Sequence, residues 1–166
     1  MAIKDLKEVY QHMLQDQYSA NKQALDMTTK LGRAAESKAV SEALIAGTNG
    51  ISQGMDEVSS LCSDHGIDPT GAHCKGMEGL VNEAKAHAID EEFGDSDARD
   101  AMIIAQYQRL VHYAIAGYGT LAAYANRLDL DGDAAVLKKC LDETYDGDRR
   151  MTDIATDGGV NAAAAT

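Results

Sequence analysis

The chain of 166 residues contains one Pro, one Phe and no Trp. A β-sandwich or β-barrel needs β-branched and aromatic strands separated by frequent turn residues, so this composition argues against both classes. Alanine, the best helix former, occurs 27 times and supplies about one residue in six. The composition therefore predicts an all-α protein, and a chain of this length can bury the core of one domain.

Membrane and nucleic-acid partners are not expected from the composition. The sequence has no apolar run of about 18 residues, the length at which a helix can cross a bilayer. Its first residues, MAIKDLKEVY, lack the apolar segment of a secretory signal, so we expect a cytoplasmic protein. The 15 Lys and Arg residues are outnumbered by 27 Asp and Glu, and the net charge of −12 argues against binding to a phosphate backbone.

Two of the three cysteines flank a short segment that also contains two histidines. Cys62, His65, His73 and Cys74 form a C-x₂-H…H-C pattern, which offers four possible zinc ligands. Structural zinc sites usually combine C-x₂₋₄-C with H-x₃₋₅-H, and the adjacent His73 and Cys74 would have to reach one ion from neighbouring directions. We therefore expect reduced thiols here, with Cys140 as the third, and a loop between two helices.

Apolar residues recur at alternating steps of three and four, the pattern of amphipathic helices that pack at a shallow angle. Gly32 is expected to end the first helix, and Ser96 is expected to cap the longest one. Residues 158–166 have nothing to bury, so we expect one domain over 1–157 followed by a disordered tail. The expected helices are 3–32, 36–65, 73–91, 97–128 and 132–156.

The short helix over 73–91 lies in a link of about 30 residues between the second and third long helices. A link of this length lets the two long helices run parallel, which a short turn does not allow. The predicted architecture is a four-helix bundle with one long crossover, the arrangement of ferritin-like folds.

Five segments carry a resemblance to a known family. They are QDQYSANKQ (15–23), CKGMEGLVNEA (74–84), ARDAMIIAQYQ (98–108), HYAIAGYGTLAA (112–123) and LDETYDGDRRMTDIA (141–155). In their order and separations the chain resembles the YciF-like family of bacterial stress-associated, ferritin-like proteins. The resemblance implies a bundle that is commonly dimeric. It also implies, for many members, a carboxylate-and-histidine site that holds two iron or manganese ions between the helices.

The positions where the family carries metal ligands are mostly substituted in this chain. A pair of divalent ions carries a charge of about +4 and needs several carboxylates, but this core offers at most two, Glu143 and Asp148, both on the same helix. Loss of the metal makes the joint loss of its ligands favourable, because unpaired buried carboxylates are very costly. We therefore expect no cofactor, with iron or manganese as the alternative. The family ligand positions are Asn21, Ala46, Asn49, Val111, Ala114 and Glu143.

A relocated metal site is the alternative to a lost one. His112 follows the substituted position Val111, and it could join Glu143 and Asp148 as ligands. The other possibility is that His112 lies on the flank of its helix and hydrogen-bonds another helix. Six tyrosines at helical spacing are expected to fill the core with their hydroxyls in contact with water.

The leading functional hypothesis is a non-catalytic structural or interaction protein, with a stress role implied only by the resemblance. A metal-binding, oxidoreductase-like protein is the alternative. Whether the chain is an enzyme therefore stays open, although the sequence favours a protein without catalytic activity. A third hypothesis is a small-molecule pocket beside Gly47, Gly50 and Gly54, where the lost ligands leave space.

Two structural expectations accompany these hypotheses. Buried Asn21 and Asn49 should hydrogen-bond each other, Gln17 or Asp148, because buried amides need partners. A homodimer should form through the outer faces of the first two helices, with Leu14 and Tyr18 as the best anchors because they are four residues apart. The other apolar residues expected on these faces are Ile3, Val9 and Ile45.

Overall fold

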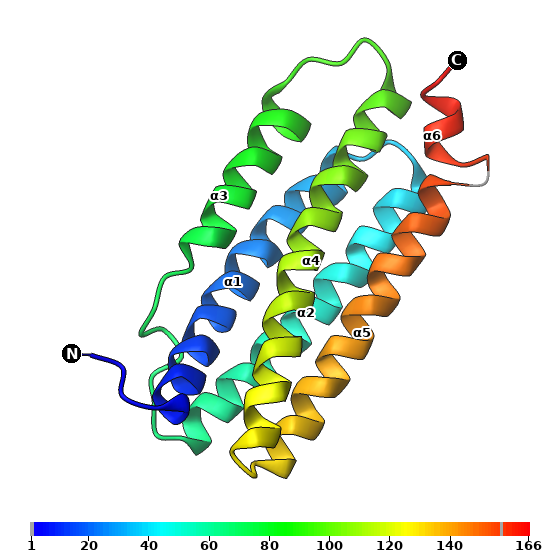
Figure 1. Cartoon of the computed structure of the whole chain (residues 1–166). Coiled ribbons are helices and arrows are strands. Elements are labelled where there is room, and N and C mark those ends of the chain that lie inside the picture. The colour runs from blue at the N-terminus through cyan, green and yellow to red at the C-terminus, as the bar shows by residue number, and fades with distance from the viewer. Residues whose placement is uncertain (1, 157) are drawn as a thin grey trace.

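The computed structural model of the chain describes residues 2–156 and 158–166. Within them all regular structure is helical and no strand is present, so the predicted all-α class is confirmed (Figure 1). The helices are α1 (Leu6–Ala34), α2 (Lys38–Asp64), α3 (Lys75–Ala84), the π-helical η1 (Lys85–Asp90), α4 (Ser96–Arg127), α5 (Asp131–Ala155) and α6 (Val160–Ala163).

The four long helices α1, α2, α4 and α5 form the bundle, and a crossover joins its two halves. Helices α1 and α2 pack as one antiparallel pair, and α4 and α5 as the other. The crossover over 65–95 carries α3 and η1 along α1 and α4 to the opposite end of the molecule, so that α2 and α4 run parallel (Figure 1). The predicted crossover with its short helix is confirmed, and this is the ferritin-like arrangement.

Two helix ends differ from the sequence expectation. The N-cap of α4 is Asp95, whose carboxylate accepts a hydrogen bond from the Ala98 amide at 2.8 Å, while Ser96 is already helical. An aspartate at this position also places its negative charge near the positive end of the helix dipole. Helix α1 continues through Gly32 to Ala34, because Leu31 and the two residues after Arg33 pack on the core and outweigh the low helix propensity of glycine.

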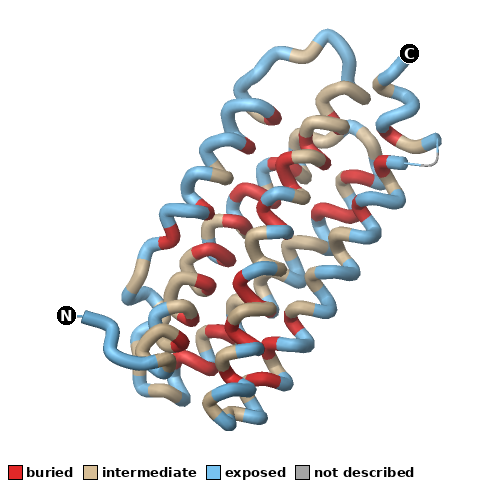
Figure 2. The backbone as a smooth tube through the Cα atoms, in the orientation of Figure 1, coloured by how far each residue is buried: buried red, intermediate tan, exposed pale blue. Residues whose placement is uncertain are grey.

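The core forms two apolar clusters, one in each half of the bundle's length (Figure 2). Leu14 is 0 % exposed and belongs to one of these clusters, so its expected place on an outer dimer face was wrong. A helix that faces a core buries a stripe wider than the two positions of a strict 3,4 seam. Leu14 lies within this stripe on α1, next to the seam residues Tyr10 and Gln17, and Met13 packs partly buried beside it.

The C-terminal residues form structure where a disordered tail was expected. Val160–Ala163 are the short helix α6, which lies beside α4, and Val160 is buried against the core. The positive φ of Gly158 (83°) turns the backbone towards this helix. The burial of Val160 therefore holds the alanine-rich segment of α6 against the bundle. The expected domain boundary at residue 157 lies outside the described residues.

No helix of the described residues is long and apolar enough to cross a membrane.

Candidate functional site

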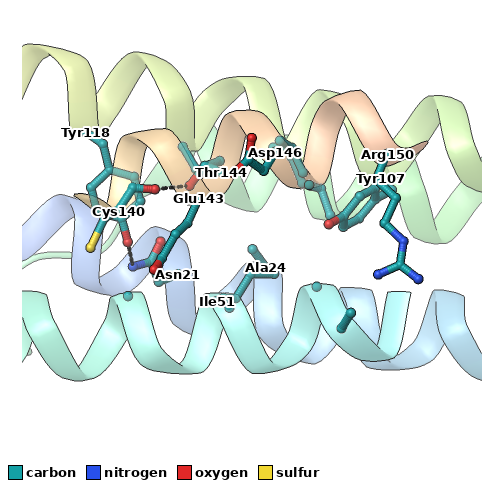
Figure 3. A pocket seen from close by; sticks show the side chains of 18 of the residues that line it. Asn21, Ala24, Ile51, Tyr107, Tyr118, Cys140, Glu143, Thr144, Asp146 and Arg150 are labelled. Carbon is teal, nitrogen blue, oxygen red and sulfur yellow. Dashed lines mark hydrogen bonds between the residues drawn. The ribbon is translucent and has the colours of Figure 1, made fainter. Parts of the chain in front are cut away.

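A cavity of about 250 Å³ lies between α1, α2, α4 and α5, near the middle of the bundle (Figure 3). Its floor is apolar, and polar side chains of α5 stand at its rim. The lining includes Ala24, Ala43, Ile51, Leu110, Val111 and Ala114 from the first three of these helices and Glu143, Asp146 and Arg150 from α5. The cavity occupies the place at which a ferritin-like bundle holds its metal ions.

Five of the six family ligand positions line this cavity, and one does not. Asn21, Ala46, Val111, Ala114 and Glu143 contribute to its wall, whereas the side chain of Asn49 is exposed on the outside of α2. The side of α2 that faces the cavity includes Gly47, Ile51 and Gly54. Asn49 is two residues beyond Gly47 and so points away from that face by about 200°. The expected burial of Asn49 and its hydrogen bond to Asn21 were therefore wrong.

Asn21 is instead held by two buried side chains. Gln17 Nε2 donates to Asn21 Oδ1 at 2.9 Å, and Asn21 Nδ2 donates to the Tyr118 hydroxyl oxygen at 2.8 Å. The amide of Asn21 is only 4 % exposed, so both bonds are needed to satisfy it. The expected partnership with Gln17 is confirmed, and Tyr118 takes the place of Asn49. Burial raises the pKa of Tyr118 above its usual range, so the phenol is protonated.

The two tyrosines of α4 that border the cavity both lie over glycines of α2. A Cβ atom on Gly47 would stand 2.5 Å from the Tyr107 hydroxyl oxygen, and one on Gly54 would overlap the Tyr118 hydroxyl. The glycines on the inner face of α2 therefore make room for phenol rings. From the sequence these glycines predicted space beside the helix but not the phenol rings, because the partner residues lie more than 50 positions away.

The candidate ligands of a relocated metal site are only partly brought together. His112 Nε2 and Asp148 Oδ2 are 3.0 Å apart, which joins α4 to α5, and Gln108 Nε2 donates to the other Asp148 oxygen at 3.1 Å. The nearest basic partner of Glu143 is Lys139, at 3.9 Å. No three His, Cys, Asp or Glu side chains of the described chain lie close enough to hold a metal ion. Of the two possibilities for His112, the structure therefore shows a hydrogen bond from α4 to another helix, α5.

The three cysteines are free and buried, each in its own surroundings. The Sγ atom of Cys74 accepts a hydrogen bond from the Met77 amide at 3.4 Å at the start of α3, and it lies 3.0 Å from the Tyr113 hydroxyl. Burial raises the pKa of Cys62 and of Cys140 to about 11. These thiols are therefore protonated at neutral pH and poor nucleophiles.

The two histidines of the C-x₂-H…H-C pattern have different partners. His73 lies 3.2 Å from a carboxylate oxygen of Glu78. His65 lies 2.6 Å from Asp133 Oδ2, which also accepts a hydrogen bond from the Tyr10 hydroxyl at 2.7 Å. This cluster of Tyr10, His65 and Asp133 joins α1, α2 and α5 at one end of the bundle. No local sequence pattern indicated this cluster, because its members are 55 to 123 positions apart.

The residues at the family ligand positions do not fit a pair of iron or manganese ions. Such a site takes its ligands as carboxylates and imidazoles from all four helices. Here the wall presents hydrocarbon at Ala46, Val111 and Ala114, and the amide of Asn21 is already used in two hydrogen bonds. Glu143 supplies a single carboxylate, which cannot offset the charge of two divalent ions.

Comparison with known proteins places the chain in a family. The family described as a domain of unknown function, DUF892, matches residues 5–165. Protein YciF of Escherichia coli K12 is 36 % identical over 158 residues, which are 93 % of each chain. The crystal structure of the E. coli stress protein YciF superimposes with a TM-score of 0.85 at 33 % identity, over 92 % of this chain and 96 % of that one. YcfI of Rhodopseudomonas palustris superimposes with a TM-score of 0.86 at 27 % identity, over 93 % and 97 %. The chain therefore belongs to the DUF892 family of YciF-like, ferritin-like proteins.

Proposed function

We propose that the protein is a non-catalytic structural or interaction protein, active in a stress response, that has lost the di-metal centre of ferritin-like bundles. The observation that carries this proposal is the wall of the central cavity, where Asn21, Ala46, Val111 and Ala114 stand at family ligand positions. The relatives support the physiological part, since YciF is described as a stress protein and the description of YcfI suggests a structural role.

Metal analysis tests the proposal directly. The protein, purified without chelator and then incubated with Fe²⁺ or Mn²⁺ and desalted, should retain well under one equivalent of metal per chain. Retention of about two equivalents would overturn the proposal. The variant Glu143→Gln serves as a control, because any metal that depends on the one remaining carboxylate would be lost from it.

A metal-binding, oxidoreductase-like function at a relocated site is the second candidate. The contact of His112 with Asp148 favours it, because an imidazole and a carboxylate from two helices already meet there. Only two side chains are in place, and His112 is 62 % exposed, so the site would need further ligands. One equivalent of metal that disappears in both His112→Ala and Asp148→Asn would establish a relocated metal site and contradict the first proposal.

We also propose that two chains form a homodimer in solution. With Leu14 in the core and Val9 and Tyr18 partly buried, the most exposed of the apolar residues expected on the outer faces of α1 and α2 is Ile45, at 57 %. Burial of such a side chain in a two-fold contact would stabilise the pair. Sedimentation at low micromolar concentration should give a dimer for the natural protein and a monomer for Ile45→Glu. Ala123→Glu, which adds the same charge on the exposed side of α4, should remain dimeric. A monomeric natural protein would contradict the proposal.

A cytoplasmic location without nucleic-acid or membrane partners completes the proposal. Three free, buried thiols fit a reducing compartment, and the net charge of −12 disfavours binding to nucleic acid and to anionic lipid. Cell fractionation should recover the protein with cytoplasmic markers. Recovery with the membrane or periplasmic fraction would contradict this part alone.

A further inference from the structure

We propose that the central cavity binds a small carboxylate with an apolar body, held at its charged end by Tyr107 and Arg150. This inference adds a ligand to the proposed non-catalytic function and does not depend on it. It rests on the cavity's apolar floor, on a buried phenol that lacks a partner, and on the charges at the rim.

The floor of the cavity suits hydrocarbon. Its wall between α1, α2 and α4 is made by aliphatic side chains and by glycines, among them Ala24, Ile51, Leu110 and Val111. An engineered apolar cavity of about 150 Å³ accepts benzene. A volume of about 250 Å³ then corresponds to a molecule of roughly ten non-hydrogen atoms.

Tyr107 supplies a hydrogen-bond donor without a partner. Its side chain is only 3 % exposed and its hydroxyl lies at the cavity wall beside Gly47, yet it makes no hydrogen bond to any described residue. The hydroxyl opens onto the cavity and is not sealed inside the protein, so an acceptor from a bound molecule can reach it and take the place of water. Burial and the nearby charge of Asp148 raise the pKa of Tyr107 to about 12. The phenol therefore keeps its proton at neutral pH and can donate it in a hydrogen bond.

The charges at the rim favour an anion at the Tyr107 end. Arg150 lies near Tyr107, at the opposite end of the close-up view from Asn21, Tyr118 and Glu143 (Figure 3). Within the described chain Arg150 has no ion-pair partner, whereas its neighbour Arg149 pairs with Asp146.

The two other acidic groups close to this cavity are already engaged. Asp148 accepts hydrogen bonds from Gln108 and meets His112. Glu143 is within 3.9 Å of Lys139. The free cation and the free phenol thus lie at one end of an apolar space, which is the arrangement that fits a carboxylate with a hydrocarbon body.

Three probes with the same eight-carbon chain test the proposal: octanoate, octanol and octylamine. Calorimetric titration of the full-length protein should show one saturable site for octanoate. Octanol, which keeps the chain but not the charge, should bind about tenfold more weakly, since a hydrogen bond to a charged group is worth about that factor. Octylamine should bind more weakly still, because its charge would face Arg150.

Two variants remove the groups that hold the carboxylate. Tyr107→Phe and Arg150→Gln should each weaken octanoate binding by about tenfold. Arg150→Gln should leave octanol binding unchanged, because octanol carries no charge, whereas Tyr107→Phe should weaken octanol binding less than it weakens octanoate binding. The matched controls are Tyr145→Phe on α5 and Arg127→Gln at the end of α4, neither of which lines the cavity. Both should bind octanoate within about twofold of the natural protein.

A third variant locates the site. Gly50 lines the cavity, and a Cβ atom there would meet open space, so Gly50→Leu should fold and fill the entrance. Gly79→Leu makes the same change in open space on α3, away from the cavity. Octanoate binding should be lost in the first variant and kept in the second.

The proposal is overturned if no probe binds saturably, or if Gly50→Leu binds octanoate as well as Gly79→Leu does. It is also overturned if octanol matches octanoate and the two carboxylate-holding variants change nothing, because the cavity would then take hydrocarbon without recognising an anion. Circular dichroism of every variant should match that of the natural protein, which separates lost binding from lost folding.

Discussion

At the scale of single residues, the interior of the bundle shows how a polar side chain is accommodated where the family resemblance implies a charged one. Asn21 is neutral, and each half of its amide has one partner, Gln17 on its own helix and Tyr118 on α4. A carboxylate at this place would need a cation or several donors to repay its lost hydration. The amide needs two neutral hydrogen bonds, which the helices supply.

The first prediction concerns this pair of bonds. Asn21→Ala should lower the free energy of unfolding by about 2 kcal/mol, because it removes the partner of the buried Gln17 amide and leaves a small void. Tyr118→Phe removes only the hydroxyl that accepts from Asn21 Nδ2, and it should lower the free energy of unfolding by about 1 kcal/mol. Urea denaturation of both variants checks these values. Asn21→Ala with natural stability would show that water replaces the amide.

The second prediction concerns the pH dependence of stability. The pKa of Cys62 and of Cys140 is about 11 in the folded chain, against about 8.5 in an unfolded one. Their folded pKa is raised, so the stability they contribute is complete below about pH 8 and is lost as the pH rises towards 11. The free energy of unfolding should fall between pH 8 and pH 10.

The double variant Cys62→Ala, Cys140→Ala should be less stable overall, and its stability should depend less on pH over this range. Urea denaturation in a reducing buffer at several pH values gives both slopes. Equal slopes in the two proteins would contradict the assignment of the effect to these thiols.

At the scale of elements, α2 and α4 meet through tyrosine hydroxyls placed over glycines. The third prediction is a graded series of Gly→Ala changes along α2. Gly54→Ala should be the most harmful, at about 2 kcal/mol, because the new Cβ would overlap the hydroxyl of Tyr118, which Asn21 holds in place. Gly47→Ala should be milder, because Tyr107 has cavity space into which to move. Gly50→Ala should stabilise the chain by up to about 1 kcal/mol through helix propensity.

A double variant provides the control for this series. Tyr118→Phe removes the overlapping oxygen, and the next ring atom would lie 3.4 Å from the new Cβ on Gly54, an ordinary contact. Gly54→Ala should therefore cost much less stability in the Tyr118→Phe background than in the natural one. Equal costs in both backgrounds would show that backbone packing, and not the hydroxyl, requires the glycine.

Asp100 ties α4 to the turn between α1 and α2. Its carboxylate is fully buried and accepts hydrogen bonds from the Glu36 amide at 3.0 Å and the Ser37 amide at 2.6 Å. The fourth prediction is that Asp100→Ala lowers the free energy of unfolding by about 2–3 kcal/mol, because two charge-assisted hydrogen bonds are lost. Asp97→Ala, in the first turn of α4, should lower it by about 0.5 kcal/mol through the helix dipole alone. Urea denaturation distinguishes these values, and equal losses would contradict the role given to Asp100.

Local patterns predicted the helices well and their contacts poorly. The 3–4 spacing located each long helix to within about three residues, because amphipathic periodicity survives packing. Leu14 and Asn49 were misplaced, because the exact angle of a buried face depends on how neighbouring helices cross. The contacts of Tyr107 with Gly47 and of His65 with Asp133 join distant residues, so no local signal announces them.

At the scale of the whole molecule, the length of the crossover fixed the topology and the family resemblance fixed the place of the cavity. Neither the crossover length nor the resemblance could predict which polar groups line the cavity. The resemblance located positions whose ligands are missing. The three-dimensional arrangement showed that Tyr107 and Arg150 lie beside the resulting space without a hydrogen-bond or ion-pair partner among residues 2–156 and 158–166. The site is therefore defined by which polar groups lack partners, a property that sequence does not display.

The net charge of −12 acts on the molecule as a whole. Acidic side chains repel one another more in the compact state than in the extended chain, and salt screens this repulsion over distances beyond about 10 Å at 0.1 M. The fifth prediction is that raising KCl from about 20 to about 300 mM increases the melting temperature by about 3 °C, equivalent to roughly 1 kcal/mol for a chain of this size.

The double variant Asp56→Asn, Glu92→Gln changes two exposed carboxylates that form no ion pair in the described chain, and it changes the net charge from −12 to −10. It should show a smaller increase and a higher melting temperature at low salt. A melting temperature that falls with KCl would mean that the surface ion pairs outweigh the repulsion.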